Sequence, residues 1–212
     1  MATTKNITMK QFNGTDYDTL YPKTVYNQVS GVAPAGYGLG KEVTAYILDA
    51  NTATEAGWYY WGKDTVNTPS NYGAMLVIPR FSNSTTQLAF LDTGGVTASQ
   101  ICVRKQMDGV WGEWEWVNPP MVVGTEYRTT ERYQSKPVYV KLVNFGALPN
   151  STSKSFAHEI SDLKFVVDIY GSGVAGQDVK VSVDTTNITI TSTSNLSSVT
   201  AYPVIKYTKT TD

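Results

Sequence analysis

The segment VWGEWEWVNPP, residues 110–120, brings tryptophans and carboxylates together in a pattern that suits carbohydrate chemistry. Its three tryptophans alternate with Glu113 and Glu115. A tryptophan ring offers an apolar face on which a sugar can stack, and glycoside hydrolysis requires two suitably separated carboxylates. The segment could therefore bind a glycan, cleave one, or build a hydrophobic core.

Cleavage is the less favoured of these interpretations. Residues two apart on a strand have Cβ atoms about 7 Å apart, and a cationic partner for Glu113, Arg104 in the pairing derived below, would keep that carboxyl ionised although a general acid must be protonated. We therefore predict a binding protein and not an enzyme, with a glycan depolymerase as the weaker alternative.

Other catalytic chemistry has few candidates. The chain has one histidine and one cysteine, which excludes a histidine-rich metal site and the usual zinc frameworks, and no glycine-rich phosphate loop is present. A Ser-His-Asp set can be drawn from His158, Asp162 and either Ser155 or Ser161, but triads are identified by geometry. We interpret His158 as a loop histidine that bonds to the backbone, and we predict no metal and no cofactor.

The segment GWYYWG, residues 57–62, is a second candidate ligand surface. In a strand, Trp58 and Tyr60 would point to one side and Tyr59 and Trp61 to the other. The sequence does not say which pair points outward, so we take Tyr60 and Trp61 as candidate contacts. The alternative is that all four rings are core or subunit contacts.

The segment YGSGVAGQD, residues 170–178, is a third candidate. Its glycines predict a turn-rich tip, and such loops on rigid scaffolds often carry function. Tyr170, Gln177 and Asp178 supply the ring and the polar groups that a neutral sugar needs. The alternative is an ordinary solvated turn.

Composition limits the class of partner. The chain has 212 residues, of which 17% are charged and 41% hydrophobic, with a formal net charge of -1. That balance gives no basic surface for nucleic acid or anionic lipid. No apolar window is long enough for a membrane span, and the first ten residues lack the apolar core of a signal peptide. We expect synthesis in a cytoplasm without export by that route, no membrane insertion and no nucleic-acid partner.

The tryptophans of the first segment are positioned by a predicted hairpin. Asp108-Gly109 joins two alternating runs, which is a strong signal for a two-residue turn. The turn fixes a register with the pairs Met107–Val110, Gln106–Trp111, Arg104–Glu113, Val103–Trp114 and Ile101–Trp116.

This register assigns the hairpin side chains to two faces. The apolar face, predicted to be core, carries Ile101, Val103, Met107, Val110, Trp114 and Trp116. The other, predicted to face water, carries Cys102, Arg104, Gln106, Trp111, Glu113 and Glu115. Trp111, Arg104 and Gln106 are therefore the predicted ligand contacts of this segment. A bulge at Gly112 is the alternative, because it would turn Trp111 inward.

The whole chain is predicted to be mainly β. Threonine and alternating polarity favour strands, and Gly, Asn, Asp and Ser supply the turns. Four segments predict an antiparallel β-sandwich: residues 136–146, 164–171, 177–194 and 199–209. The predicted organisation is an attachment segment or linker over 1–38, a domain over 39–118, and a β-sandwich domain over 119–212.

Several segments, in order, resemble parts of phage fibres. GWYYWGKDTVNTPSNYGAMLVI followed by SQICVRKQMDGVWGEWEWV resembles the knob domain of phage tail fibres and pyocin fibres. The lead-in MKQFNGTDYDTLYPKT is similar to the opening of short phage tail or baseplate proteins. VNFGALPNSTSKSFAHEISDLKFVVDIYG and AYPVIKYTKT resemble the distal receptor-binding head of such fibres.

The resemblance implies a virion appendage protein with a small knob-like α+β domain and a distal β-sandwich head that contacts the host surface. It implies a homotrimer, attachment to other virion proteins through the N-terminal segment, and a bacterial surface glycan as ligand. The chain lacks a long repetitive shaft, which favours a compact baseplate or head protein. A structural adaptor or capsid decoration protein without a ligand is the alternative.

Overall fold

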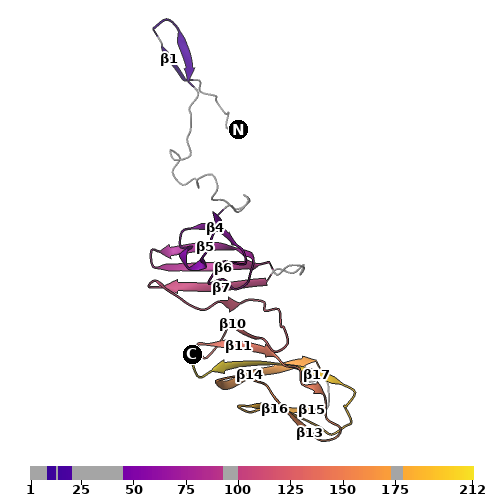
Figure 1. The fold of residues 1–212 in the computed structure, drawn as a ribbon. Coiled ribbons are helices and arrows are strands. Elements are labelled where there is room, and N and C mark those ends of the chain that lie inside the picture. The colour runs from indigo at the N-terminus through magenta and orange to yellow at the C-terminus, as the bar shows by residue number, and fades with distance from the viewer. Residues whose placement is uncertain (1–8, 13, 21–44, 93–99, 173–178) are drawn as a thin grey trace, which may run out of the picture. The chain divides into compact units, whose positions relative to one another are not determined.

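The computed structural model describes residues 9–12, 14–20, 45–92, 100–172 and 179–212 (Figure 1). The chain divides into two compact units, residues 1–42 and 43–212. In the first unit, β1 (Met9–Phe12) and β2 (Tyr17–Leu20) form an antiparallel hairpin. Between these strands Gly14 has a positive φ of 99°. An attachment role for this unit stays a prediction.

The second unit begins with a run of neighbouring strands. These are β3 (Ala45–Tyr46), β4 (Gly57–Trp61), β5 (Gly73–Phe81), β6 (Ser84–Leu91), β7 (Gln100–Met107), β8 (Val110–Trp111) and β9 (Glu115–Trp116). Strands β4 to β7 pair antiparallel in chain order, β3 pairs parallel with β4, and β8 and β9 both pair with β7.

One face of this sheet carries the first core. The alternation of buried residues along β6 and β7 places every second side chain inward. The buried residues are Ile47, Ala50, Ala53, Trp61, Met75, Val77, Ala89, Leu91 and Cys102. A 3-10 turn, Ala50–Thr52, packs here and begins at Asp49, whose carboxylate accepts the Asn51 N–H at 2.8 Å. The described residues contain no α-helix, so the α part predicted for residues 39–118 is not found among them.

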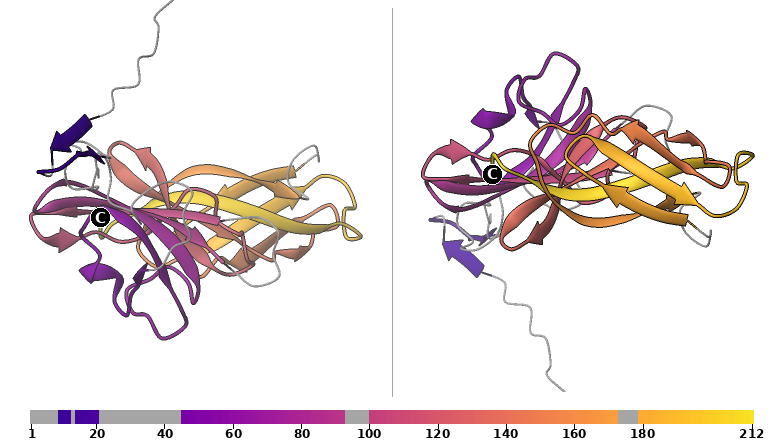
Figure 2. Two further views of the ribbon diagram at one scale, coloured as in Figure 1. Left: turned by 90° about the horizontal axis from the view of Figure 1, so that it is seen from above. Right: turned by 90° about the horizontal axis from the view of Figure 1, so that it is seen from below.

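The remaining strands build the sandwich. They are β10 (Glu126–Tyr133), β11 (Lys136–Leu142), β12 (Gly146–Ala147), β13 (Ser153–Ala157), β14 (Leu163–Ser172), β15 (Val179–Val183), β16 (Asn187–Ser192) and β17 (Thr200–Lys209). In one layer β17 pairs with β11, β12 and β14, and β11 pairs with β10. The other layer is the three-stranded sheet β13-β16-β15, visible beside the first in Figure 2.

The two layers share a second core. Ile188 and Ile190 of β16 pack with Ile205 and Tyr207 of β17, and all four side chains are buried. These residues come from the segments whose alternating polarity predicted strands. The mainly β fold predicted from the sequence is confirmed. A single parallel bridge, Trp116 to Thr129, connects β9 to β10 and so makes the first layer of the sandwich continuous with the preceding sheet.

The predicted hairpin is confirmed at its turn and wrong beyond it. Asp108 and Gly109 both have positive φ, 51° and 80°, as a type I′ turn requires, and Gln106 pairs with Trp111 as predicted. Past Trp111 the register shifts by one residue, so that Cys102 pairs with Trp116 and Val103 with Glu115.

The assignment of the two hairpin faces is also wrong. Cys102, Arg104 and Gln106 are buried, whereas Met107 and Val110, predicted to be core, are 52% and 72% exposed. The physical reason is that the polar side chains on the buried face of β7 find partners inside the fold: Arg104 donates to Gln87 on β6, and Gln106 donates to the carbonyl of Gly109 in the turn. Counting the apolar residues on each face of the hairpin therefore assigned the wrong face to the core. Trp114 and Trp116 do pack against the first core, as predicted.

Candidate functional site

Arg104, a predicted ligand contact, is part of the protein interior. Only 6% of it is exposed, and its Cζ lies 4.4 Å from the ring centroids of both Trp111 and Trp114. Its Nε donates to Oε1 of Gln87 at 2.9 Å. Burial lowers the pKa of the guanidinium to about 10, so that it is still charged at neutral pH. The prediction that this face is wet is corrected.

Gln87 connects this arginine to the loop that covers the core. Its amide nitrogen donates to the carbonyl oxygens of Ala50 at 2.7 Å and Ala53 at 2.9 Å. Trp111 is half-buried, and its Nε1 donates to the carbonyl of Asn51 at 3.2 Å. These bonds tie the loop, the sheet and the hairpin together. Trp111 and Arg104 thus already serve in packing, and a ligand role for them stays a prediction.

Gln106 is buried next to the turn. Its side-chain amide lies 3.4 Å from the carbonyl oxygen of Gly109, to which it donates. Because the Gln106 side chain is buried and bonds to the turn, it does not form an open surface together with Trp111.

Tyr60 and Trp61 border an open groove of about 420 Å³ at one end of β4, β5 and β6. The groove is also lined by Tyr72, Gly73, Ala74, Phe90, Leu91 and Asp92. Tyr60 points outward, whereas Trp61 is buried with its Nε1 donating to the Ser70 carbonyl at 3.0 Å. The sequence left the orientation of GWYYWG open, and the structure assigns Trp61 to the core and Tyr60 to the surface.

Tyr170 borders a second hollow, of about 190 Å³, on the first layer of the sandwich. We call it the Tyr170 pocket, and it is lined by Trp116, Val117, Pro119, Met121, Thr129, Thr130, Glu131, Val140, Tyr170 and Lys206. Among these residues Val140 and Thr129 are buried, whereas Tyr170 is 42% exposed. Gln177 and Asp178, the other two candidates of this segment, lie outside the described residues.

Charged groups of the Tyr170 pocket come from strands that are distant in sequence. Nζ of Lys206 on β17 binds both carboxylate oxygens of Glu131 on β10, at 2.6 and 2.9 Å. The same Nζ lies 5.8 Å from the ring centroid of Tyr170. The hydrogen bond to Glu131 raises the pKa of Lys206 despite its partial burial. The pocket therefore presents an ammonium, a carboxylate and an aromatic ring side by side.

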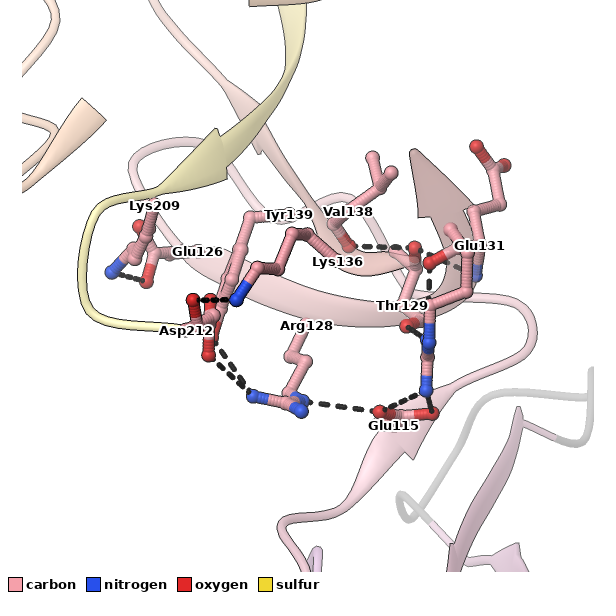
Figure 3. Close-up of polar contacts among 11 residues, drawn as sticks. Glu115, Glu126, Arg128, Thr129, Glu131, Lys136, Val138, Tyr139, Lys209 and Asp212 are labelled. Atoms are coloured by element: carbon pink, nitrogen blue, oxygen red, sulfur yellow. Dashed lines mark hydrogen bonds and ion pairs between the residues drawn. The ribbon is translucent and has the colours of Figure 1, made fainter. Parts of the chain in front are cut away.

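A network of ion pairs fixes β9 against β10 beside this pocket (Figure 3). Glu115 accepts Nε of Arg128 at 3.1 Å and Nη2 of Arg132 at 2.8 Å. Nη1 of Arg128 continues to Asp212 at 3.0 Å and to the Tyr139 hydroxyl at 3.1 Å. Thr129 and Glu131, which line the pocket, lie between these two arginines along β10, so the network holds the strand that supplies one wall.

Sequence reasoning missed Thr130, Glu131 and Lys206. Glu131 follows an alternating strand and Lys206 sits inside YPVIKYTK, so each looks like an ordinary surface charge. Their meeting depends on the strand order β10-β11-β17, which brings residues 75 positions apart into contact. No pattern within a short stretch of the sequence indicates this strand order.

The residues considered for catalysis have structural roles. His158 is buried; its Nδ1 accepts the Ile160 N–H at 3.0 Å, and its Nε2 lies 3.1 Å from the Asp184 carbonyl. The interpretation of His158 as a loop histidine bonded to the backbone is confirmed. Ser155 bonds to Thr189 instead. Glu115 is ion-paired with Arg128 and Arg132. Among the described residues no group of three metal-ligating side chains occurs.

Comparisons with known proteins give structural neighbours only. No protein-family model and no curated protein matches the chain. An N-truncated R2-type pyocin tail fibre is 12% identical with a TM-score of 0.31, over 79% of this chain and 97% of that one. Fibres of the R1 and R2 pyocins of P. aeruginosa are 12% identical with TM-scores of 0.33, over 82% of this chain and 68% and 69% of theirs.

These scores are too low to establish a shared fold. In the part of the chain that the structure describes, no helix is long and apolar enough to cross a membrane.

Proposed function

We propose that this chain is a component of a virion appendage, such as a tail fibre, baseplate or head fibre, and that it recognises the bacterial host surface by binding a glycan. The order of fibre-like motifs in the sequence suggests the appendage. The chemistry of the Tyr170 pocket supports the glycan, and this pocket is the observation that carries the proposal.

A sugar ring has apolar faces and a belt of hydroxyls, so its site needs a ring to stack on and groups that donate and accept hydrogen bonds. In the Tyr170 pocket, Tyr170 supplies the ring. Glu131 accepts and Lys206 donates, while the hydroxyl of Thr130 does either. Apolar lining residues such as Trp116, Met121 and Val140, together with a few convergent polar groups, are the usual composition of a small-molecule site. The volume of about 190 Å³ suits a small ligand.

The groove beside Tyr60 is larger but offers less polar chemistry. Most of its lining is aromatic or aliphatic, with Asp92 as its one charged residue. An aromatic surface without convergent hydrogen-bond donors does little to fix the orientation of a bound sugar. The groove therefore ranks second as a glycan site.

Binding without cleavage is part of the proposal. Glu131 is ion-paired with Lys206 and Glu115 with two arginines, so both carboxylates are engaged within the chain, whereas glycoside hydrolysis uses a pair of carboxyl groups that act on the substrate. Release of fragments from host polysaccharide by the wild-type protein would show that this part is wrong.

A cell-binding assay on a panel of bacterial strains tests the function. Labelled protein is expected to bind some strains and not others, and extraction of the wall glycan from a binding strain should abolish the signal. Uniform absence of binding would favour a structural adaptor or decoration protein. Binding that survives glycan extraction would point to a protein receptor and contradict the glycan assignment.

A further inference from the structure

The charges that line the Tyr170 pocket compensate each other within the chain. Nζ of Lys206 binds both carboxylate oxygens of Glu131, at 2.6 and 2.9 Å. An ammonium has more hydrogens, and a carboxylate more lone pairs, than this ion pair uses. The pocket therefore offers a ligand both donors and acceptors of hydrogen bonds, but its lining carries no net charge.

A second carboxylate faces Lys206 from the neighbouring strand. Asp168 on β14 is the cross-strand partner of Lys206 on β17, and side chains directly opposite each other in an antiparallel pair lie on the same face. The hydrogen bond to Glu131 is the main cause of the raised pKa of Lys206, and the charge of Asp168 adds to it. The ammonium therefore has two carboxylates near it, although Asp168 itself does not line the pocket.

Among the described residues that line the pocket, Lys206 is the one cation. The arginines of β10, Arg128 and Arg132, are ion-paired with Glu115, and Arg128 also with Asp212. A ligand anion would have to take Lys206 away from its carboxylate, or lie beside that carboxylate without a partner. Both arrangements cost free energy that a neutral hydroxyl does not lose.

The position of Glu131 is fixed by an irregularity in β10. The register with β11 shifts between Arg128 and Arg132, and a β-bulge of this kind re-aims a side chain. The hydroxyl of Thr129 accepts the Glu131 N–H at 3.2 Å and donates to the Val138 carbonyl oxygen at 2.7 Å (Figure 3). Nη1 of Arg132 donates to the Glu131 carbonyl oxygen at 3.1 Å. The backbone of Glu131 is thus held at both its N–H and its carbonyl, and its carboxylate reaches Lys206.

We propose that Glu131 restricts the Tyr170 pocket to neutral sugars and excludes acidic ones, such as uronic acids and sugars that carry phosphate. This inference rests on the proposed function and adds the charge class of the ligand to it. Neutral hydroxyls accept from Lys206 and donate to Glu131 while the ion pair stays intact. Specificity of this kind comes from repulsion of the wrong ligand as well as from attraction of the right one.

Ligand-observed NMR on the full chain, with pairs of methyl glycosides, tests the proposal. Each pair consists of a neutral hexoside and the uronate that has a carboxylate in place of its hydroxymethyl group. Wild-type protein is expected to bind at least one hexoside, and to bind its uronate at least about tenfold more weakly. Glu131→Gln keeps the size of the side chain but removes the charge that compensates Lys206. It should raise the affinity for the uronate relative to the hexoside at least about tenfold.

Glu113→Gln is the matched control, because it removes the same charge at an exposed position that does not line the pocket. Its preference should equal that of wild-type protein. The side chain of Glu131 is exposed, so added salt should reduce the gain that Glu131→Gln gives. Circular dichroism shows whether each variant folds, and Glu131→Thr, whose β-branched side chain suits a strand, replaces Glu131→Gln if it does not.

Two kinds of result would overturn the proposal. Wild-type protein that binds a hexoside and its uronate equally contradicts it, as does an unchanged preference of Glu131→Gln or an equal change in Glu113→Gln. These outcomes leave the glycan site standing, because a sugar is still bound. Wild-type protein that binds neither member of any pair contradicts the glycan site itself, and the charge class falls with it.

Discussion

The guanidinium of Arg104 stacks on the ring of Trp111, with Cζ 4.4 Å from the ring centroid. The pair closes the hairpin over the loop that follows β3, because Trp111 also bonds to the Asn51 carbonyl. Trp111, which the sequence predicted to be an exposed sugar-binding ring, instead holds three segments of the fold together. Trp114 has a similar role, since Cζ of Arg104 also lies 4.4 Å from the centroid of its ring.

Removal of the Trp111 ring should therefore destabilise the fold. Trp111→Ala loses the contact with Arg104, the bond to Asn51 and half-buried apolar area, which together predict a loss of about 2 kcal/mol in the free energy of unfolding. Urea denaturation measures it. Val110→Ala, at the exposed neighbouring position, should change stability by less than about 0.5 kcal/mol. Equal stability of the two variants would show that Trp111 is free of the interior.

The arginine network predicts that substitution of Glu115 lowers the free energy of unfolding, whereas substitution of its neighbour Glu113 does not. Glu115→Gln removes the charge that two arginines bind, and we expect a loss of about 1 kcal/mol that shrinks as salt is added. Glu113→Gln, at an exposed position, should be nearly neutral. Thermal melts at low and high salt measure both. A salt-independent loss at Glu115 would contradict the ion-pair explanation.

Cys102 is expected to resist thiol reagents in the native protein. Its side chain is fully buried, and burial raises the pKa of the thiol from 9.0 to about 12. Labelling at pH 8 should occur only after urea is added. Rapid labelling of the native protein would contradict this burial.

The same raised pKa makes a prediction about stability in alkali. A thiol that holds its proton more tightly when folded contributes stability in full below about pH 9, and this is lost as the pH rises from about 9 to about 12. Wild-type protein should therefore lose more stability over that range than Cys102→Ala. Parallel pH profiles of the two proteins would mean that the thiol is not coupled to folding.

Gly171 should not tolerate a side chain. Its φ is 126°, and a Cβ there would lie 2.4 Å from the Tyr202 carbonyl oxygen. Gly171→Ala is expected to cost at least about 2 kcal/mol, through backbone strain and the displaced β17. At Gly112 an added Cβ would meet the Lys105 carbonyl oxygen at 3.4 Å, an ordinary contact distance, so Gly112→Ala should cost less. Chemical denaturation that ranks the two equally would contradict this explanation.

Local chemistry predicted part of this structure well. The Asp108-Gly109 turn and the strands of the sandwich follow from residue types and alternation. The buried face of β7 could not be predicted in this way. Arg104 and Gln106 are polar residues that were expected to face water, because the sequence does not show that Gln87 and a turn carbonyl accept their hydrogen bonds. Apart from Tyr170 itself, the residues of the Tyr170 pocket could not be predicted from the sequence either. Its walls come from β10, β14 and β17, whose adjacency is set by long-range pairing.

Pro203 illustrates the same limit. A proline in a strand predicts an edge or a bulge, yet β17 has neighbours on both sides. On the side away from β14, β11 pairs with β17 as far as Val204 and β12 pairs with it at Ala201, so Pro203 falls between these two ladders. Its carbonyl oxygen accepts the Val143 N–H on that side at 2.9 Å. Val143 lies 60 positions earlier in the chain (203 minus 143), so no local pattern predicts this arrangement.

The most direct test of the glycan site compares two tyrosines on adjacent strands. Tyr170 lines the pocket and Tyr202 does not, although the two side chains are similarly exposed, at 42% and 37%. On a strain that binds wild-type protein, Tyr170→Ala should weaken cell binding at least about tenfold, while Tyr202→Ala binds like wild type. Unchanged binding by Tyr170→Ala, with both variants folded, would contradict the assignment of the glycan site to this pocket.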